Sequence, residues 1–284
     1  MIALLMSSPP TESCDARRRR LLLGLLAGVA PWTHADAKLP RVDAKACLLL
    51  RDGVEWLAQD ADRLLPMASL TKMMTALLVL ESGRPLDEIV AVPPEAARDT
   101  GTRLGLRAGE RMTIGDLLAA AVIASANDAC LALAMTVAGN ESRFVQGMNA
   151  RAATLGLAQT RFANVCGHDA PSHVSTAREL AKLAVAAMRD PRYRRLAATS
   201  QVSIASRDPA PRSFALANRN ELVGRHPGVI GVKSGTTPNA GRCLAAFAMR
   251  GEHSALLILL DARERWWTAG ALLDQALDGD EPLR

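Results

Sequence analysis

The chain has 284 residues, of which 49% are hydrophobic, 22% are charged and 3% are aromatic. It is too long for a disulfide-stapled miniprotein and too apolar for a disordered segment, so it can bury a core as one large domain or as two lobes. Lysine and arginine (34) outnumber aspartate and glutamate (29), but the basic residues form only one run, Arg17–Arg20. With few aromatic residues for base stacking, no nucleic-acid partner is expected.

The first 37 residues have the pattern of an export signal. Arg17–Arg20 precede the apolar stretch Leu21–Trp32, and Ala35-Asp36-Ala37 follows. This order is typical of a secretory signal peptide, with cleavage expected after Ala37. The apolar stretch is shorter than the roughly 20 residues that span a bilayer, so we expect a periplasmic protein without a stable membrane anchor. An uncleaved surface anchor is the alternative, and the arginines also fit a twin-arginine signal.

The mature chain, taken in order, predicts strands at both ends and helices between them. Periodicity and turn residues predict a β-hairpin of Ala44–Arg51 and Val54–Gln59, followed by a helix over Ser69–Glu81 and by short strands and turns over 89–113. Two buried helices are expected over Thr113–Ala138, joined at 125–127, and further helices over Glu141–Leu155 and Thr176–Met188. The chain then predicts strands over Val229–Lys233, Cys243–Met249 and Ser254–Leu260, and a closing helix over Arg265–Leu277. Polar residues interrupt the 113–138 run, which argues against a membrane span.

This element order predicts an α/β (α+β) fold. One antiparallel sheet is built from both chain ends and flanked by helices, and a mostly helical lobe is inserted. We expect residues 38–90 and 225–279 to form the α/β part of a domain over 38–279, residues 91–224 to form the mostly helical part, and residues 280–284 to be a tail. A cleft between the two parts is the expected ligand site.

The mature cysteines predict buried thiols rather than a metal ribbon or a redox motif. Cys47, Cys130, Cys166 and Cys243 are widely spaced, and no C-x-x-C pair occurs. Cys47 and Cys243 lie in strand-like runs and Cys130 in an apolar helix, where free cysteine behaves as a small hydrophobe. One disulfide after export remains the alternative.

The first of three polar motifs is Ser69-Leu70-Thr71-Lys72. Side chains three residues apart on a helix share a face, so the hydroxyl and the amine can touch. An apolar run follows Lys72, and dry surroundings favour an uncharged amine, which could act as a general base on Ser69. On the order of one such spacing arises by chance in a chain this long, so an unrelated surface pair is the alternative.

The second motif is Ser125-Ala126-Asn127, at the expected junction of two helices. A hydroxyl here could relay a proton to a leaving amine. The amide could hold a lysine through its oxygen and donate to a substrate carbonyl through its nitrogen. Serine and asparagine at such a junction often cap a helix instead, and taken alone the motif favours capping.

The third motif is Lys233-Ser234-Gly235-Thr236-Thr237, after the strand-like residues 228–232. Glycine at a strand allows the backbone of a ligand to approach closely. Lys233, Ser234 and Thr236 supply a cation and hydroxyls that suit a carboxylate. A polar strand end and turn without a ligand is the alternative.

Together and in this order, the motifs resemble the signature of the serine penicillin-recognising enzymes, S-x-x-K, S-x-N and K-[ST]-G. Further segments are similar to the serine-type D-alanyl-D-alanine carboxypeptidase family, the low-molecular-mass penicillin-binding proteins: residues 66–76, 101–110 (GTRLGLRAGE), 127–130, 164–169, 175–177 and 231–241 (GVKSGTTPNAG). The resemblance covers nearly all of residues 40–275 and implies a DD-peptidase/β-lactamase-like fold.

The resemblance also implies a role for each motif residue. Ser69 would be the acylated nucleophile, Lys72 its base, and Ser125, Asn127 and Lys233 the rest of the proton network, with Asn127 also holding the substrate amide. The substrate-binding residues would be Ser234, Gly235, Thr236, Thr237 and Arg265, with Ser234 and Thr236 on a terminal carboxylate. Backbone N–H groups of Ser69 and Thr236 would form the oxyanion hole. Arg265 is placed by counting back from the closing helix, and Arg263 is the alternative.

The implied activity is a periplasmic carboxypeptidase that removes the C-terminal D-Ala from peptidoglycan stem peptides through an acyl-serine, with β-lactams as covalent inhibitors and no metal or cofactor. A DD-endopeptidase and a slow penicillin-sensing module remain alternatives. The sequence departs from the family at Ala126, usually glycine, and at His168, usually leucine, for which the sequence offers no account. Because it ends after the last helix, we expect no further β domain and no amphipathic anchor.

Other enzyme classes fit less well. A class A β-lactamase needs a carboxylate for deacylation, and neither Asp169 nor Glu179 has the expected arrangement. The single tyrosine, Tyr193, follows Asp190-Pro191 and is expected on the surface, away from any site. The histidines lack a G-x-S-x-G partner for a triad. For His168, Asp169 and His173, ordinary hydrogen bonds are favoured over a metal site.

Overall fold

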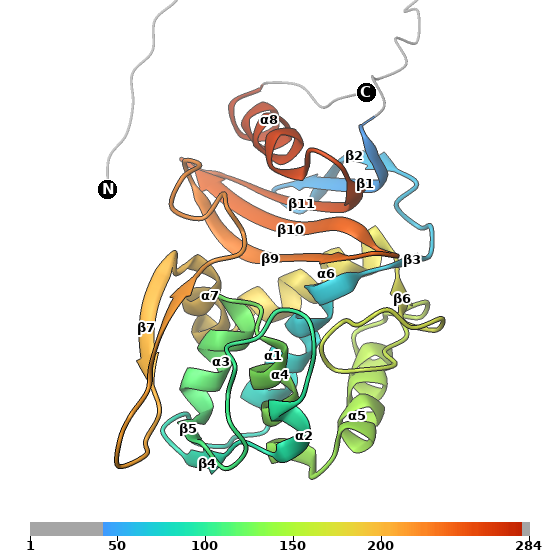
Figure 1. Cartoon of the computed structure of the whole chain (residues 1–284). Coiled ribbons are helices and arrows are strands. Elements are labelled where there is room, and N and C mark those ends of the chain that lie inside the picture. Colours follow the sequence, from blue (N-terminus) through green and yellow to red (C-terminus); the bar gives the residue numbers. More distant parts are fainter. Residues whose placement is uncertain (1–41, 280–284) are drawn as a thin grey trace, which may run out of the picture. The chain divides into compact units, whose positions relative to one another are not determined.

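The structure, a computed structural model, describes residues 42–279 (Figure 1). The predicted signal peptide (1–37) and the tail (280–284) lie outside these residues. None of the described helices combines the length and the apolar character that crossing a membrane requires.

A five-stranded antiparallel sheet joins the two ends of the described chain, in the order β2-β1-β11-β10-β9. Its strands are β1 (Ala44–Arg51), β2 (Val54–Gln59), β9 (Val229–Thr237), β10 (Gly241–Arg250) and β11 (His253–Ala262). β1 pairs with β11 from Ala44 opposite Ala262 to Arg51 opposite Ala255. The predicted α/β fold with a sheet built from both chain ends is confirmed.

Helices cover both faces of this sheet (Figure 1). Successive side chains of a strand point to opposite faces, so Cys47 and Leu49 of β1 pack with Leu273 of α8 (Arg265–Asp278). Leu48 points the other way, into the larger core that contains Leu180 of α6 (Ala177–Arg189). Burial on both faces explains why the central strands are continuous apolar runs.

Between β2 and β9 the chain is mostly helical. A 3₁₀ turn, η1 (Ala68–Thr71), leads into α1 (Lys72–Glu81), and the further helices are α2 (Pro94–Ala97), α3 (Ile114–Val122), α4 (Asn127–Ala138), α5 (Glu141–Thr154), α6 and α7 (Pro191–Ala198). Thr113, Asn140 and Thr176 cap α3, α5 and α6 by accepting a backbone N–H three residues on. Short strand pairs connect them: β3 (Leu65–Pro66) with β6 (Val174–Ser175), β4 (Ile89–Ala91) with β5 (Arg111–Thr113), and β7 (Gln201–Ala205) with β8 (Ser213–Ala217).

The structure differs from the sequence expectation in three places. The strand expected to end at Lys233 runs on to Thr237, so the third motif lies within edge strand β9. The β7–β8 hairpin lies in a stretch expected to be mostly helical. The surface position predicted for Tyr193 is wrong, because its side chain is fully buried. Asp190 caps α7 and Pro191 starts it, so this dipeptide begins a helix that packs against the core.

The four described cysteines are free and buried, as predicted from their apolar surroundings.

Candidate active site

Ser69 and Lys72 lie at the junction of η1 and α1. In a 3₁₀ turn, residues three apart are eclipsed, and Lys72 Nζ donates to Ser69 Oγ over 3.1 Å. The expected helix therefore begins as a tighter turn, which brings the two side chains into line. Ser69 is half-buried, whereas Lys72 is only 1% exposed.

Lys72 is surrounded by hydrogen-bond acceptors as well as apolar groups. Its Nζ also donates to Asn127 Oδ1 at 2.7 Å and to the carbonyl oxygen of Cys166 at 2.6 Å. Three acceptors can satisfy all three N–H bonds of an ammonium. To act as a base on Ser69, Lys72 would have to be in its uncharged form.

Lys233 is a second buried amine, on β9, and it is 2% exposed. It donates to the carbonyl oxygen of Ser234 at 3.0 Å. Burial, and then the charge of Lys72, hold the pKa of Lys233 well below its usual range. This lowering favours the uncharged amine at Lys233.

Ser125 and Asn127 lie at the clefts beside Ser69, and neither caps a helix. Ala126 occupies the N-cap position of α4, and no side chain caps it. Ser125 has a left-handed backbone, with a φ of +60°, and lines a cleft beside Ser69. Asn127 accepts from Lys72 through Oδ1 and donates through Nδ2 to the carbonyl oxygen of Thr100 at 2.6 Å. The capping alternative is therefore wrong for this motif.

Strand β9 approaches the 3₁₀ turn η1 at Gly235. A β-carbon at this position would lie 2.6 Å from the backbone nitrogen of Ser69, so only glycine fits. Arg265, the first residue of α8, donates through Nη1 to Thr236 Oγ1 at 2.8 Å and to the carbonyl oxygen of Gly235 at 2.7 Å. The structure thus places Arg265 at the site, whereas Arg263 is exposed.

Two polar clefts meet at Ser69. The first has a volume of about 200 Å³ and is lined by Ser69, Thr102, Ser125, Arg219, Glu221, Ser234, Gly235, Thr236 and Arg265. The second, of about 260 Å³, is lined by Ser69, Thr100, Gly101, Thr102, Asn127, Cys166, Gly167, His168, Asp169, Thr236, Thr237 and Pro238. The described structure thus brings the motif residues together, with Lys72 and Lys233 buried behind them and Thr237 on the second cleft.

Several residues around these clefts escaped the sequence reasoning. Thr102 joins Ser69 and the predicted Thr236 in both clefts, and the carbonyl oxygen of Arg219 accepts from Ser234 Oγ at 2.8 Å. Thr237 donates to the Asp169 carboxylate at 2.6 Å, which ties β9 to the loop of residues 164–169. These contacts join residues distant in sequence, and no spacing signalled them.

His173 contacts the 3₁₀ turn η1 through Thr71. Its Nδ1 accepts from the backbone N–H of Ala163 at 3.0 Å, and its Nε2 contacts Thr71 Oγ1 at 2.6 Å, while that hydroxyl donates to the carbonyl oxygen of Ala68 at 2.7 Å. Burial lowers the pKa of His173 to about 4, so the ring is neutral near pH 7. Both ring nitrogens of His173 are in hydrogen-bond contacts, in line with the prediction of ordinary hydrogen bonds for this residue.

Comparisons with known proteins place the chain in a family. A family model described as D-alanyl-D-alanine carboxypeptidase matches residues 34–264. The D-alanyl-D-alanine carboxypeptidase DacF of Bacillus subtilis is 33% identical over 260 residues, which are 86% of this chain and 66% of DacF. A D-alanyl-D-alanine endopeptidase of Pseudomonas aeruginosa is 33% identical over 247 residues, which are 85% of this chain and 79% of that protein.

A solved structure is similar over the same region. The Streptomyces K15 DD-transpeptidase matches with a TM-score of 0.80 and 26% identity, over 84% of this chain and 98% of that one. The chain spans just under two thirds of the length of the carboxypeptidase DacF. On its family match and its motifs, the chain belongs to the D-alanyl-D-alanine carboxypeptidase family.

Proposed function

We propose that this chain is a serine-type D-alanyl-D-alanine carboxypeptidase that trims the terminal D-Ala from peptidoglycan stem peptides. The observation that carries the proposal is the 3.1 Å contact between Lys72 Nζ and Ser69 Oγ where two polar clefts meet. Export to the periplasm, supported by the signal pattern in residues 1–37, is part of the proposal, as is covalent inhibition by β-lactams.

Acylation begins with attack of Ser69 Oγ on the carbonyl carbon of the penultimate D-Ala. Lys72, as the uncharged amine, takes the hydroxyl proton, and the C–N bond to the terminal D-Ala breaks. The proton passes through Ser125, with Lys233 behind it, to the departing amine. Backbone N–H groups of Ser69 and Thr236 stabilise the oxyanion, and one such donor contributes roughly 10²–10³ in rate. Water then hydrolyses the acyl-serine and restores Ser69.

Asn127 fixes the position of Lys72 relative to the loop that contains Thr100. It bridges Lys72 and the Thr100 carbonyl with bonds of 2.7 and 2.6 Å, so the base is fixed relative to the loop that borders both clefts. A base held within hydrogen-bond distance of its nucleophile is what proton transfer requires.

Selection of a free carboxylate follows from the first cleft. Arg265 and the hydroxyl groups of Ser234 and Thr236 line it. A hydrogen bond between a guanidinium and a carboxylate contributes roughly 1.5–3 kcal/mol, which is enough to distinguish a C-terminal acid from an amide.

The test is covalent labelling by a fluorescent penicillin together with mass spectrometry of products from a pentapeptide. We expect labelling and release of D-Ala for the wild type, and neither for Ser69→Ala. Ser203→Ala, which alters an exposed serine on β7, is the matched control and should retain both. Labelling that persists in Ser69→Ala would refute the assignment, and labelling without D-Ala release would favour the slow sensing module.

A DD-endopeptidase is the second candidate, favoured by the shape of the first cleft. Thr102, Arg219 and Glu221 also line a neighbouring pocket of about 510 Å³, which offers room for a leaving group larger than D-Ala. The endopeptidase relative from Pseudomonas aeruginosa, matched over 79% of its length, is a further argument. Incubation with a crosslinked muropeptide dimer separates the two: monomer products identify an endopeptidase, and an intact dimer with trimmed pentapeptide identifies a carboxypeptidase.

A further inference from the structure

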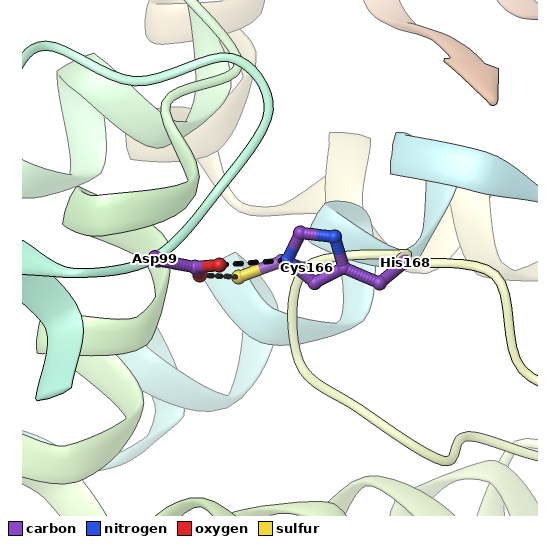
Figure 2. A group of neighbouring side chains, drawn as sticks. All are labelled: Asp99, Cys166 and His168. Atoms are coloured by element: carbon purple, nitrogen blue, oxygen red, sulfur yellow. Dashed lines mark hydrogen bonds and ion pairs between the residues drawn. The ribbon is translucent and has the colours of Figure 1, made fainter.

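Three potential metal ligands lie together at the second cleft (Figure 2). The carboxylate of Asp99, the thiol of Cys166 and the imidazole of His168 each offer one ligand atom, and these atoms all lie within 4.8 Å of one another. Asp99 lies in the segment after α2, and Cys166 and His168 lie in the loop of residues 164–169. Within residues 42–279 this is the one group of three such side chains that meets this criterion.

The spacing of the ligand atoms suits a tetrahedral ion. His168 Nε2 is 2.9 Å from Asp99 Oδ1, and Cys166 Sγ donates to Asp99 Oδ2 over 3.6 Å. Zinc bonds of roughly 2.0–2.3 Å separate neighbouring ligand atoms by about 3.3–3.8 Å, so movements of about an ångström would bring all three onto one ion. A thiolate, an imidazole and a carboxylate together form a ligand set typical of Zn²⁺.

The surroundings hold the ligands and leave them reachable. The backbone N–H of Thr100 donates to Asp99 Oδ1 at 2.7 Å, which orients the carboxylate as outer-shell bonds commonly do around a metal. Cys166, which is buried, and His168, whose side chain is 38% exposed, both line the second cleft. An ion can therefore enter from the cleft, and its fourth position would face water there.

The same two loops hold the catalytic side chains. The carbonyl oxygen of Cys166 accepts from Lys72 at 2.6 Å, and that of Thr100, the residue after Asp99, accepts from Asn127 at 2.6 Å. An ion that joins Asp99 to Cys166 and His168 would restrict the movement of the segment around Asp99 and of the loop of residues 164–169. It would also occupy part of the cleft that contains Ser69. Both effects oppose entry of a substrate.

We propose that Asp99, Cys166 and His168 form a Zn²⁺ site that bridges the two loops beside Ser69 and inhibits acylation when it is occupied. As the S–Zn bond forms, the Cys166 thiol passes its proton to the solvent, and a water completes the coordination. The site would explain the histidine at position 168, for which the sequence offered no account. The inhibitory effect rests on the proposed function, whereas binding of the ion does not.

Calorimetric titration of the metal-free protein with Zn²⁺, and absorption spectra with Co²⁺, test the binding. We expect one ion per chain, a thiolate–Co²⁺ charge-transfer band, and the same binding in Ser69→Ala, which separates this result from the peptidase assignment. Cys166→Ser should lose the band, and His168→Leu should weaken binding by at least about tenfold. His253→Leu is the matched control, since that ring also pairs with a carboxylate, Asp52 at 2.8 Å, at a place where the described residues form no such cluster.

Acylation by a fluorescent penicillin tests the inhibition. Zn²⁺ should slow labelling of the wild type and of His253→Leu, and it should not slow labelling of His168→Leu. Absence of Zn²⁺ binding, or binding that is equal in Cys166→Ser, His168→Leu and the wild type, would overturn the site. Binding without any slowing of acylation would overturn the inhibitory role.

Discussion

Gly235 and Ser69 are in direct backbone contact: a β-carbon on Gly235 would lie 2.6 Å from the Ser69 nitrogen and 2.9 Å from the β-carbon of Ala68. This approach joins edge strand β9 to the 3₁₀ turn η1, and therefore joins the sheet to the helical part of the chain. The Ser69 N–H and the residue after Gly235, Thr236, are also the two proposed oxyanion donors. Their spacing depends on the absence of a side chain at position 235.

Gly235→Ala should therefore disable the site while leaving the fold intact. The added methyl group must push β9 away from Ser69, and a displacement of about an ångström at a reacting centre costs on the order of 10²-fold in rate. We expect acylation by a fluorescent penicillin to slow by about that factor, measured as a labelling time course. Gly147→Ala is the control, because its β-carbon would meet only Leu78, at 3.9 Å; acylation of Gly235→Ala at the control's rate would contradict the argument.

Arg265→Ala should impair turnover of peptides that end in a free carboxylate. The loss of one charge-assisted hydrogen bond, roughly 1.5–3 kcal/mol, corresponds to a fall of about 10- to 100-fold in kcat/KM. The measurement compares a peptide acid with its amide, and only turnover of the acid should fall. Arg263→Ala, which removes an exposed arginine two residues away, should change neither. Equal losses for acid and amide would remove Arg265 from carboxylate recognition.

His173 should make the protein less stable in mild acid. Its folded pKa, lowered by burial to about 4, is below its unfolded value of 6.5, so the unfolded chain binds the extra proton first. Stability from this group is complete above pH 6.5 and declines as the pH falls towards 4, by up to about 3 kcal/mol.

Urea unfolding of the wild type and of His173→Asn at pH 7.5, 5.5 and 4.5 measures this contribution. Asparagine can still accept from the Ala163 N–H, and it does not titrate. The difference in unfolding free energy between the two proteins should therefore change with pH in the direction that disfavours the wild type in acid. A pH-independent difference would show that His173 is not the group responsible.

Tyr193→Phe should stabilise the protein. The ring is fully buried, and its hydroxyl has no hydrogen-bond partner among the described residues. Burial also raises the pKa of Tyr193 well above its usual range. Because an unpaired buried hydroxyl is costly, we expect its removal to increase the free energy of unfolding by about 1 kcal/mol, or a few degrees in Tm. A loss of stability of that size would instead indicate a buried partner, such as a water.

Local sequence patterns predicted many of the helices and strands, because the periodicity of such an element is set by residues close together in the sequence. Alternation and turn residues located the β1–β2 hairpin, and the helices over 141–154 and 177–189 were placed within a residue or two. Sequence patterns did not predict the β7–β8 hairpin. Its short strands are largely exposed and carry no continuous apolar run, so their pairing leaves little trace in the sequence. The surface prediction for Tyr193 was wrong because the residues next to it in the sequence are polar, although its own side chain is buried.

The amino-acid sequence by itself determined which chemistry is present: a serine and a lysine one turn apart, an amide motif, and a lysine–serine–glycine strand in the order of one family. Only the tertiary structure decided which side chains meet. It selected Arg265 over Arg263, placed His173 against Thr71 across 102 positions, and brought His168 to Asp99 across 69. Helical and strand periodicity arise from backbone geometry within a few residues, whereas contacts between loops depend on how the whole core packs beneath them.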